Sequence, residues 1–252
     1  MAEPQWELQK FIVGIRHERI FMVTDIQGAM ADHIVALSKK IQVPMGGLKW
    51  ITRPDFLSVI ISDKTEKISV NCNADGIVIQ ADIFEDSSIT IDAIQELFIR
   101  SAHLVLPLTE AKNRINRLGV VYEFYVRDFT NSAKTIFSQF TKVNLSGIPD
   151  NMLIRMSLKN PAEDSLIQPN QINDYKNVIL AISSEREKGV DPEEVEEEKE
   201  KEKVPTILKI SVDYQSYYIP PRDLKNVNIS KHLSDAKLYV DDIINKFSQD
   251  VE

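Results

Sequence analysis

One short frame of residues occurs twice in this chain. Residues 13–21 read Val-Gly-Ile-Arg-His-Glu-Arg-Ile-Phe, and residues 118–126, 105 positions later, read Leu-Gly-Val-Val-Tyr-Glu-Phe-Tyr-Val. Both copies follow the order apolar, Gly, apolar, any residue, aromatic, Glu. Each copy precedes a residue that commonly begins a helix, Asp25 or Thr130. A repeated strand-then-helix unit predicts an internally duplicated fold.

The first unit, residues 1–107, is predicted to have the order β-α-β-β-β-α. A long strand over 8–23, either continuous or bent near Gly14, precedes a helix that begins at Asp25. Three strands over 56–62, 67–72 and 77–84 then form a meander, since Asp75-Gly76 is a strong hairpin signal. A second helix begins near Ser88 or Thr90, and Pro107 ends it.

The second unit, residues 108–252, is predicted to repeat this order. A strand runs from Asn113 to Arg127, a short helix follows Thr130, and Ser230 caps the last helix. Between these helices the pattern predicts three strands, over 152–158, 178–183 and 206–218. The apolar stripes of the two unit-ending helices match at a constant offset of 142. The matched residues are Ile91, Ile94, Phe98, Ala102 and Val105 with Leu233, Ala236, Val240, Ile244 and Phe247.

The predicted fold class is therefore α+β. Two β-α-β-β-β-α units would form an antiparallel sheet with helices packed on one face, as one continuous or pseudo-twofold domain. This doubled arrangement resembles the saddle of the TATA-binding-protein fold class. A likeness of fold carries no function with it.

Composition indicates an ordinary globular chain of 252 residues, 43% of them hydrophobic. No apolar run approaches the roughly 20 residues of a membrane span, so no membrane partner is expected. The first residues lack the features of a secretory signal, which predicts a cytoplasmic protein. The single cysteine, Cys72, has no partner for a disulfide, and its alternating surroundings predict a half-buried strand residue.

The net charge of −8 is concentrated in one segment, residues 185–203. This segment holds ten acidic and five basic residues, so it contributes −5 and leaves −3 for the rest. It is predicted to be an insertion in the second unit. It is either an arm that docks on a basic partner or a solubilising linker, in helical or irregular form.

Two groups of residues are candidates for a site. Glu18 and Glu123 occupy equivalent positions in the repeated frame and could bind a cation together. The alternative is that alternation turns His17 and Tyr122 toward the core and the two glutamates to a solvated face. A second group could contact single-stranded nucleic acid, and packed tyrosines with surface arginines are its alternative. Its members are Arg114, Arg117, Tyr122, Arg127, Tyr217 and Tyr218.

The chain resembles a sporadically distributed family of bacterial proteins of unknown function. The resemblance rests on Arg117-Leu118-Gly119-Val120-Val121-Tyr122, on the late strand Ile210–Tyr214 and on a terminal helix with Phe247. Val121 stands where the family has a second arginine, and the opening strand at 11–16 lacks the family's Glu-Ala pair. The resemblance implies an accessory role, for example in mobile or antiviral defence gene clusters.

Three functions follow as hypotheses. The first is a non-enzymatic accessory subunit that binds a protein partner through its sheet face or acidic insertion. The second is a hydrolase or nuclease in which Glu18, Glu123 and Asp213 hold a divalent metal. The third is a nucleic-acid-binding saddle. No catalytic, metal or cofactor motif is present, so no catalytic residue, metal ligand or cofactor is predicted.

Overall fold

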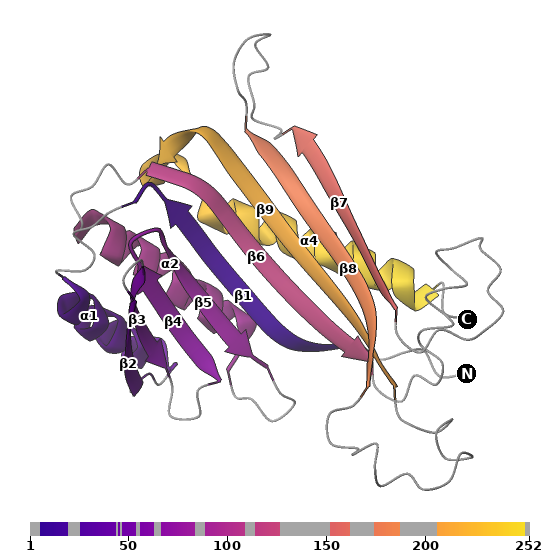
Figure 1. Ribbon diagram of the computed structural model, residues 1–252, viewed down its shortest axis with the longest axis horizontal. Helices are drawn as coiled ribbons and strands as arrows, with labels where there is room; N and C mark the ends of the chain where they lie inside the picture. Colours follow the sequence, from indigo (N-terminus) through magenta and orange to yellow (C-terminus); the bar gives the residue numbers. More distant parts are fainter. Residues whose placement is uncertain are drawn as a thin grey trace, which may run out of the picture.

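A computed structural model describes most of the two predicted units. The described residues are 6–19, 26–43, 45, 47–53, 56–62, 67–83, 89–108, 114–126, 152–161, 174–186 and 206–249. They form an α+β structure in which helices lie against one antiparallel sheet (Figure 1).

The sheet has nine strands in the order β2-β3-β4-β5-β1-β6-β9-β8-β7. Every neighbouring pair is antiparallel. Their bounds are β1 (Glu7–His17), β2 (Gly47–Arg53), β3 (Phe56–Ser62), β4 (Ile68–Asn73), β5 (Gly76–Asp82), β6 (Arg114–Val126), β7 (Leu153–Pro161), β8 (Tyr175–Arg186) and β9 (Thr206–Asp223). Because β1 pairs directly with β6, both predicted units share one sheet.

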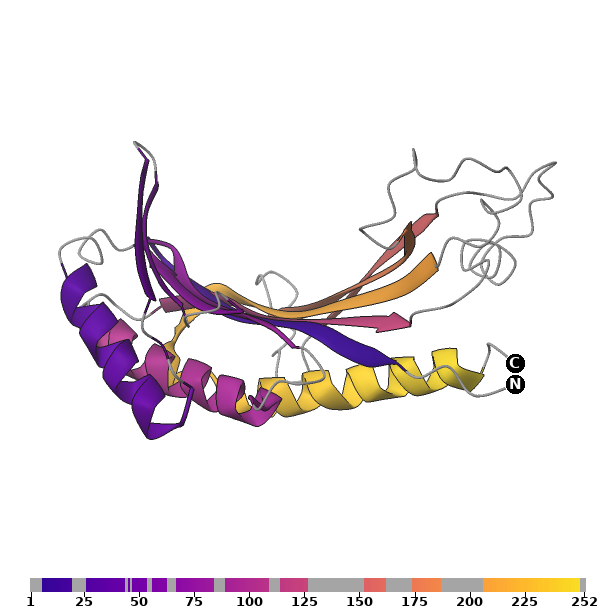
Figure 2. The same ribbon diagram turned by 90° about the horizontal axis from the view of Figure 1, so that it is seen from below.

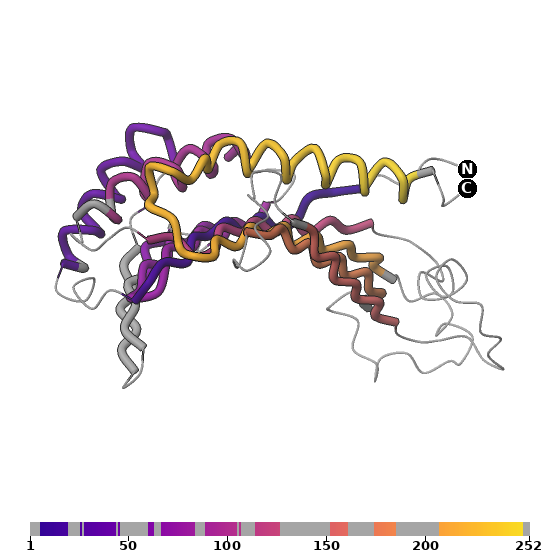
Figure 3. Tube along the Cα trace, turned by 90° about the horizontal axis from the view of Figure 1, so that it is seen from above, coloured from indigo at the N-terminus to yellow at the C-terminus, as the bar shows by residue number. Residues whose placement is uncertain are grey.

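Three described helices cover one face of this sheet. α1 (Gln27–Lys40) contacts β3, α2 (Ile91–Leu108) contacts β1 and β5, and α4 (Ile229–Gln249) contacts β6 and β9. A short 3₁₀ helix, η3 (Leu224–Asn226), leads into α4. The sheet bends away from the helices, so its other face is concave, and no described helix lies on it (Figures 2 and 3).

Strict alternation along the strands builds the core between sheet and helices. Phe11, Val13 and Ile15 on β1 are buried, as are Leu118, Val120 and Tyr122 on β6. Phe11 and Tyr122 pack edge to face with ring centroids 5.0 Å apart. This placement confirms the prediction that His17 and Tyr122 face the core while the glycines face the other side.

Cys72 is also buried in this core, deeper than the half-buried position predicted from the sequence. Burial raises the pKa of its thiol to about 12, which makes the thiol unreactive at neutral pH.

The predicted Asp75-Gly76 hairpin joins β4 to β5, but Gly76 serves a different purpose from the one expected of a turn glycine. Its φ is not in the left-handed region. A Cβ atom at Gly76 would instead lie 2.3 Å from the backbone oxygen of Ile15. Gly76 is therefore required for the close approach of β5 to β1.

Several features differ from the sequence prediction. The first unit has an additional strand, β2, which begins at the second glycine of the Gly46-Gly47 pair and precedes Pro54, so its seven residues resemble a loop in sequence. Pro107 lies within the last turn of α2 instead of ending it. The α4 cap is Asn228, whose Oδ1 accepts a hydrogen bond from the Lys231 amide at 2.9 Å, and Ser230 is already helical.

Of the other predicted features, some are confirmed and some fall outside the described residues. Thr90 caps α2 as predicted, because its Oγ1 accepts from the Ala93 amide at 3.2 Å. The cap at Asp25, the short helix after Thr130 and residues 187–203 of the acidic segment lie outside the described residues. None of the described helices has the length and apolar character to cross a membrane.

Candidate functional site

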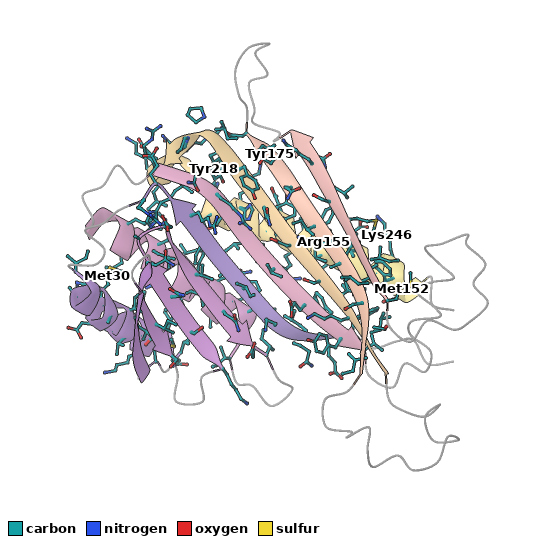
Figure 4. The ribbon with its side chains drawn as sticks, in the orientation of Figure 1. Met30, Met152, Arg155, Tyr175, Tyr218 and Lys246 are labelled. Atoms are coloured by element: carbon teal, nitrogen blue, oxygen red, sulfur yellow. The ribbon has the colours of Figure 1, made fainter. Side chains whose placement is uncertain are left out.

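The candidate site is the concave face of the sheet, which we call the open face. Figure 4 shows this face with side chains, and Arg155 and Tyr175 are labelled on its second half. The described helices cover only the opposite side (Figure 2), and Arg155 is exposed on the open face.

Two glycines of the repeated frame create a hollow at the centre of the open face. Gly14 on β1 and Gly119 on β6 are direct cross-strand partners. Since neither carries a side chain, a depression of about 200 Å³ remains above them. Its lining consists of Ile12, Gly14, Ile15, Arg16, Val78, Arg117, Gly119, Val121 and Asp213.

The two glycines differ in how much room surrounds them. A Cβ at Gly14 would lie 3.0 Å from Val78 Cγ2 and 3.2 Å from the Ile77 carbonyl oxygen, both tight contacts. A Cβ at Gly119 would meet nothing closer than 3.7 Å. A side chain at position 119 would therefore extend into the hollow without displacing the backbone.

Two arginines and one aspartate stand at the hollow. Arg16 and Arg117 are cross-strand partners beside the glycine pair. The Arg117 guanidinium reaches over Gly119 toward Asp213, with 3.9 Å between Arg117 Nη2 and Asp213 Oδ2. Burial raises the pKa of Asp213, against the opposing effects of a hydrogen bond from Gln215 and of the nearby arginines. Asp213 Oδ1 is buried and has no hydrogen-bond partner among the described residues.

A row of cations and aromatic rings crosses the second half of the open face. Tyr175 on β8 and Tyr217 on β9 stack with centroids 4.6 Å apart and planes 9° from parallel. Lys159 Nζ lies 4.1 Å from the centroid of Tyr175, and the Arg117 guanidinium lies 5.6 Å from the centroid of Tyr217. The order Lys159, Tyr175, Tyr217, Arg117 places a cation on each outer ring face. We call this row the cation–tyrosine ladder.

Hydrogen bonds hold the ladder in place. Tyr217 Oη donates to Gln215 Oε1 at 2.8 Å, and Asn177 Nδ2 donates to the same oxygen at 3.3 Å. Ser157 Oγ donates to Asn177 Oδ1 at 2.9 Å, which extends the network to β7. Side chains fixed in this way lose little conformational freedom when a ligand binds.

The open face is basic although the chain is acidic. Its described strand side chains include six basic residues (Lys10, Arg16, Arg117, Arg155, Lys159 and Lys209) and four acidic ones (Glu7, Asp82, Glu123 and Asp213), a net charge of +2. Three of these acids, Asp82, Glu123 and Asp213, are within ion-pair distance of a base. Lys10 lies 3.7 Å from Asp82, and Lys209 lies 3.2 Å from Glu123.

The predicted nucleic-acid residues are divided between the two sides of the sheet. Arg117 and Tyr217 lie on the open face. Tyr122 is buried beneath the helices, and Tyr218 turns to the helix side, where the Arg222 guanidinium is 5.4 Å from its centroid. Arg114 donates to the Pro221 carbonyl and lies 3.7 Å from Glu18, at the end of the sheet. Arg127 lies outside the described residues.

The structure separates the two glutamates of the repeated frame. Glu123 pairs with Lys10, eight positions along the chain from Glu18, so roughly 25 Å of strand lies between them. The antiparallel pairing of the two frames about Gly14 and Gly119 causes this, because it sends the frames in opposite directions. Asp213 lies near Glu123 but is held by Arg117. In the described part of the chain, no group of three or more His, Cys, Asp and Glu side chains could hold a metal.

A buried serine–histidine pair was not anticipated from the sequence. Ser216 Oγ on β9 and His232 Nδ1 on α4 are hydrogen bonded at 2.9 Å. Burial, helped by the nearby Lys176, lowers the pKa of His232 to about 3. A neutral imidazole with so low a pKa is a poor general base at neutral pH, so we assign this pair to packing. The only sequence signal was the position of His232 beside the apolar stripe of α4.

Two comparisons with known proteins found no match for this chain. No protein-family model matches the chain, and no curated protein matches it. The resemblance to the bacterial family therefore stays a prediction.

Proposed function

We propose that this protein is a non-enzymatic interaction module, an accessory subunit that binds a partner protein on the open face. The observation that carries this proposal is the hollow between Gly14 and Gly119, which lies at the centre of a concave and basic surface. Concave, preformed surfaces with a few convergent charged groups are typical binding sites.

We further propose that the scaffold is an internal duplication with a saddle shape. Three observations support this: the sheet order, in which antiparallel strands of each unit lie on either side of the β1–β6 pair, the glycine-to-glycine pairing of the two frames, and the concave open face. The pairing puts an approximate twofold axis through the hollow. A partner would therefore meet related surfaces on both sides of it.

The details of the open face favour a protein partner over a nucleic acid. Single-stranded nucleic acids bind by stacking bases on accessible aromatic faces. In the cation–tyrosine ladder, each ring face is already covered by the other tyrosine or by a cation. Three of the four described acids on this face also lie beside a base, which weakens the attraction of the face for a phosphate backbone.

A pair of charge reversals tests the proposal. In the first variant, Arg16→Glu with Arg117→Glu, we expect affinity for the native partner to fall at least about tenfold, because like charges would face the partner. The second variant, Lys237→Glu with Lys246→Glu, changes the same charge on the exposed side of α4 and should retain the partner. The measurement is recovery of co-purifying protein with the tagged full chain in its source cells, followed by titration of the identified partner.

Two results would contradict the proposal. The first is an unaltered chain that purifies alone, as an inert monomer. The second is equal loss of the partner in both variants, which would move the interface away from the open face. Circular dichroism and thermal unfolding of each variant check that it has folded.

A further inference from the structure

From the chemistry of the hollow we infer the kind of segment that the partner presents, an inference that rests on the proposed function. We propose that the hollow receives one apolar side chain from an acidic segment of the partner protein. The basic residues of the open face bind the carboxylates on either side of that side chain.

The apolar part of this inference follows from the floor and size of the hollow. Ile12, Val78 and Val121 line it, and the glycine pair leaves its base without side chains. Its volume of about 200 Å³ is below the roughly 300–1,000 Å³ of pockets that enclose cofactors or drug-sized ligands. One aliphatic side chain matches both its size and its chemistry, and burying that side chain favours binding.

The acidic part follows from charge complementarity. The open face carries a net +2 among its described strand side chains, in a chain of net −8. Three of its acids form ion pairs with Lys10, Arg117 and Lys209, and the other basic residues of the face are Arg16, Arg155 and Lys159. Arg16 lines the hollow, and Arg155 and Lys159 lie on β7, where Lys159 forms the outer end of the cation–tyrosine ladder. Carboxylates on both sides of a buried apolar side chain would reach basic residues in either direction.

Arginine is well suited to this role. Its planar guanidinium binds a carboxylate through two parallel hydrogen bonds. Arg16 and Arg117 are cross-strand partners at the hollow, so both can approach one acidic residue. Arg117 is also fixed between Tyr217 and Asp213, which lowers the entropy cost of using it.

Three labelled heptapeptides test the inference. The first has a central leucine flanked by three glutamates on each side, the second has seven glutamates, and the third has leucine flanked by three lysines on each side. Binding to the full chain is followed by fluorescence anisotropy and by the amide NMR shifts of Gly14 and Gly119. We expect the leucine–glutamate peptide to bind at least about fivefold more tightly than the all-glutamate peptide, and the lysine peptide not to bind.

Filling the hollow separates its role from that of the charges. Gly119→Val places a side chain in the hollow, with room for its Cβ. We expect it to remove the preference for the leucine peptide while all-glutamate binding stays within about twofold. Ser69→Val is the matched control, because it adds the same side chain to the open face on β4, away from the hollow, and it should keep the preference. Arg16→Glu should weaken both acidic peptides.

Several results would overturn the inference. Equal binding of the leucine–glutamate and all-glutamate peptides would show that no apolar contact contributes. A preference for the leucine–glutamate peptide that persists in Gly119→Val would show that the apolar contact lies outside the hollow. Tighter binding of a labelled thymidine oligonucleotide than of either acidic peptide would make nucleic acid the ligand. If any of these occurred while the charge reversals still released the native partner, the inference about the hollow would be wrong and the proposed function would stand.

Discussion

Replacing Gly76 with alanine is expected to lower the free energy of unfolding by about 3 kcal/mol, the largest effect of any substitution proposed for this chain. The added Cβ would lie 2.3 Å from the backbone oxygen of Ile15, so β5 and β1 must move apart. Neither atom belongs to a flexible side chain that could turn away, and overpacking of this kind costs about 1–3 kcal/mol or more. Chemical denaturation, followed by circular dichroism, measures the change.

Gly28→Ala is the matched control for this prediction. Gly28 lies in the first turn of α1, and a Cβ there would meet nothing within 4 Å. Alanine at this position should stabilise the protein by about 0.5 kcal/mol, because it restricts the unfolded chain. The same chemical change is therefore expected to have opposite signs at the two sites. A loss of less than about 1 kcal/mol for Gly76→Ala would show that β1 and β5 do not pack as described.

Acid is expected to weaken the fold by about 2 kcal/mol between pH 7 and pH 5 through His232 alone. The pKa of His232 is about 3 in the folded protein because burial disfavours the charged ring, whereas an unfolded histidine has a pKa near 6.5. Below about pH 6.5 the unfolded chain therefore binds a proton that the folded chain does not. Stability is lost as the pH falls from about 6.5 toward 3, and it is retained above pH 7.

The charged groups around His232 have opposing effects on its titration. Lys176 reinforces the low pKa of His232, and Asp235 partly opposes it. Burial also lowers the pKa of His17, the last residue of β1, so His17 likewise makes the fold less stable in acid. A variant of His232 should consequently remove only part of the pH dependence.

His232→Asn isolates the contribution of this residue. Asparagine offers a hydrogen-bonding atom near the position of Nδ1, so a bond to Ser216 can persist, but it does not titrate in this range. We expect the difference in unfolding free energy between the variant and the unaltered protein to change by about 2 kcal/mol from pH 7 to pH 5. Leu238→Asn, at an exposed position on α4, introduces the same residue without removing a titrating group, so it is the control and should keep the original pH dependence. Parallel pH profiles for His232→Asn and the unaltered protein would refute the assignment.

Strand alternation explains why much of the fold could be predicted. Period-two patterns at Val13, Ile15 and His17, and at Leu118, Val120 and Tyr122, assigned the buried side of both central strands, and burial in the structure agrees. The stripes of α2 and α4 were equally clear, since helix periodicity is local. β2 was missed because a seven-residue segment that begins with a glycine and is followed by a proline resembles a loop. Pairing with β3 decides that it is a strand.

The residues of the open face were harder to predict, because strands far apart in the sequence contribute them. Arg117 and Tyr217 were chosen by composition and do lie on the open face, but Tyr122 and Tyr218, chosen with them, face the helices. Lys159 and Tyr175 were not selected, although they complete the cation–tyrosine ladder of the open face. They come from β7 and β8, and no local pattern relates those strands to β6.

The repeated frame separates what the sequence determines from what the tertiary structure decides. The sequence by itself determined that an apolar-glycine-apolar strand occurs twice, and that its glycines lie on the side away from the core, because a strand alternates its faces residue by residue. Only the tertiary structure decided that the two strands are antiparallel neighbours, with Gly14 opposite Gly119. That register depends on contacts between residues 105 positions apart. It brings the two glycines together, so that one hollow forms above them, and it places Glu18 and Glu123 at opposite ends of the strand pair.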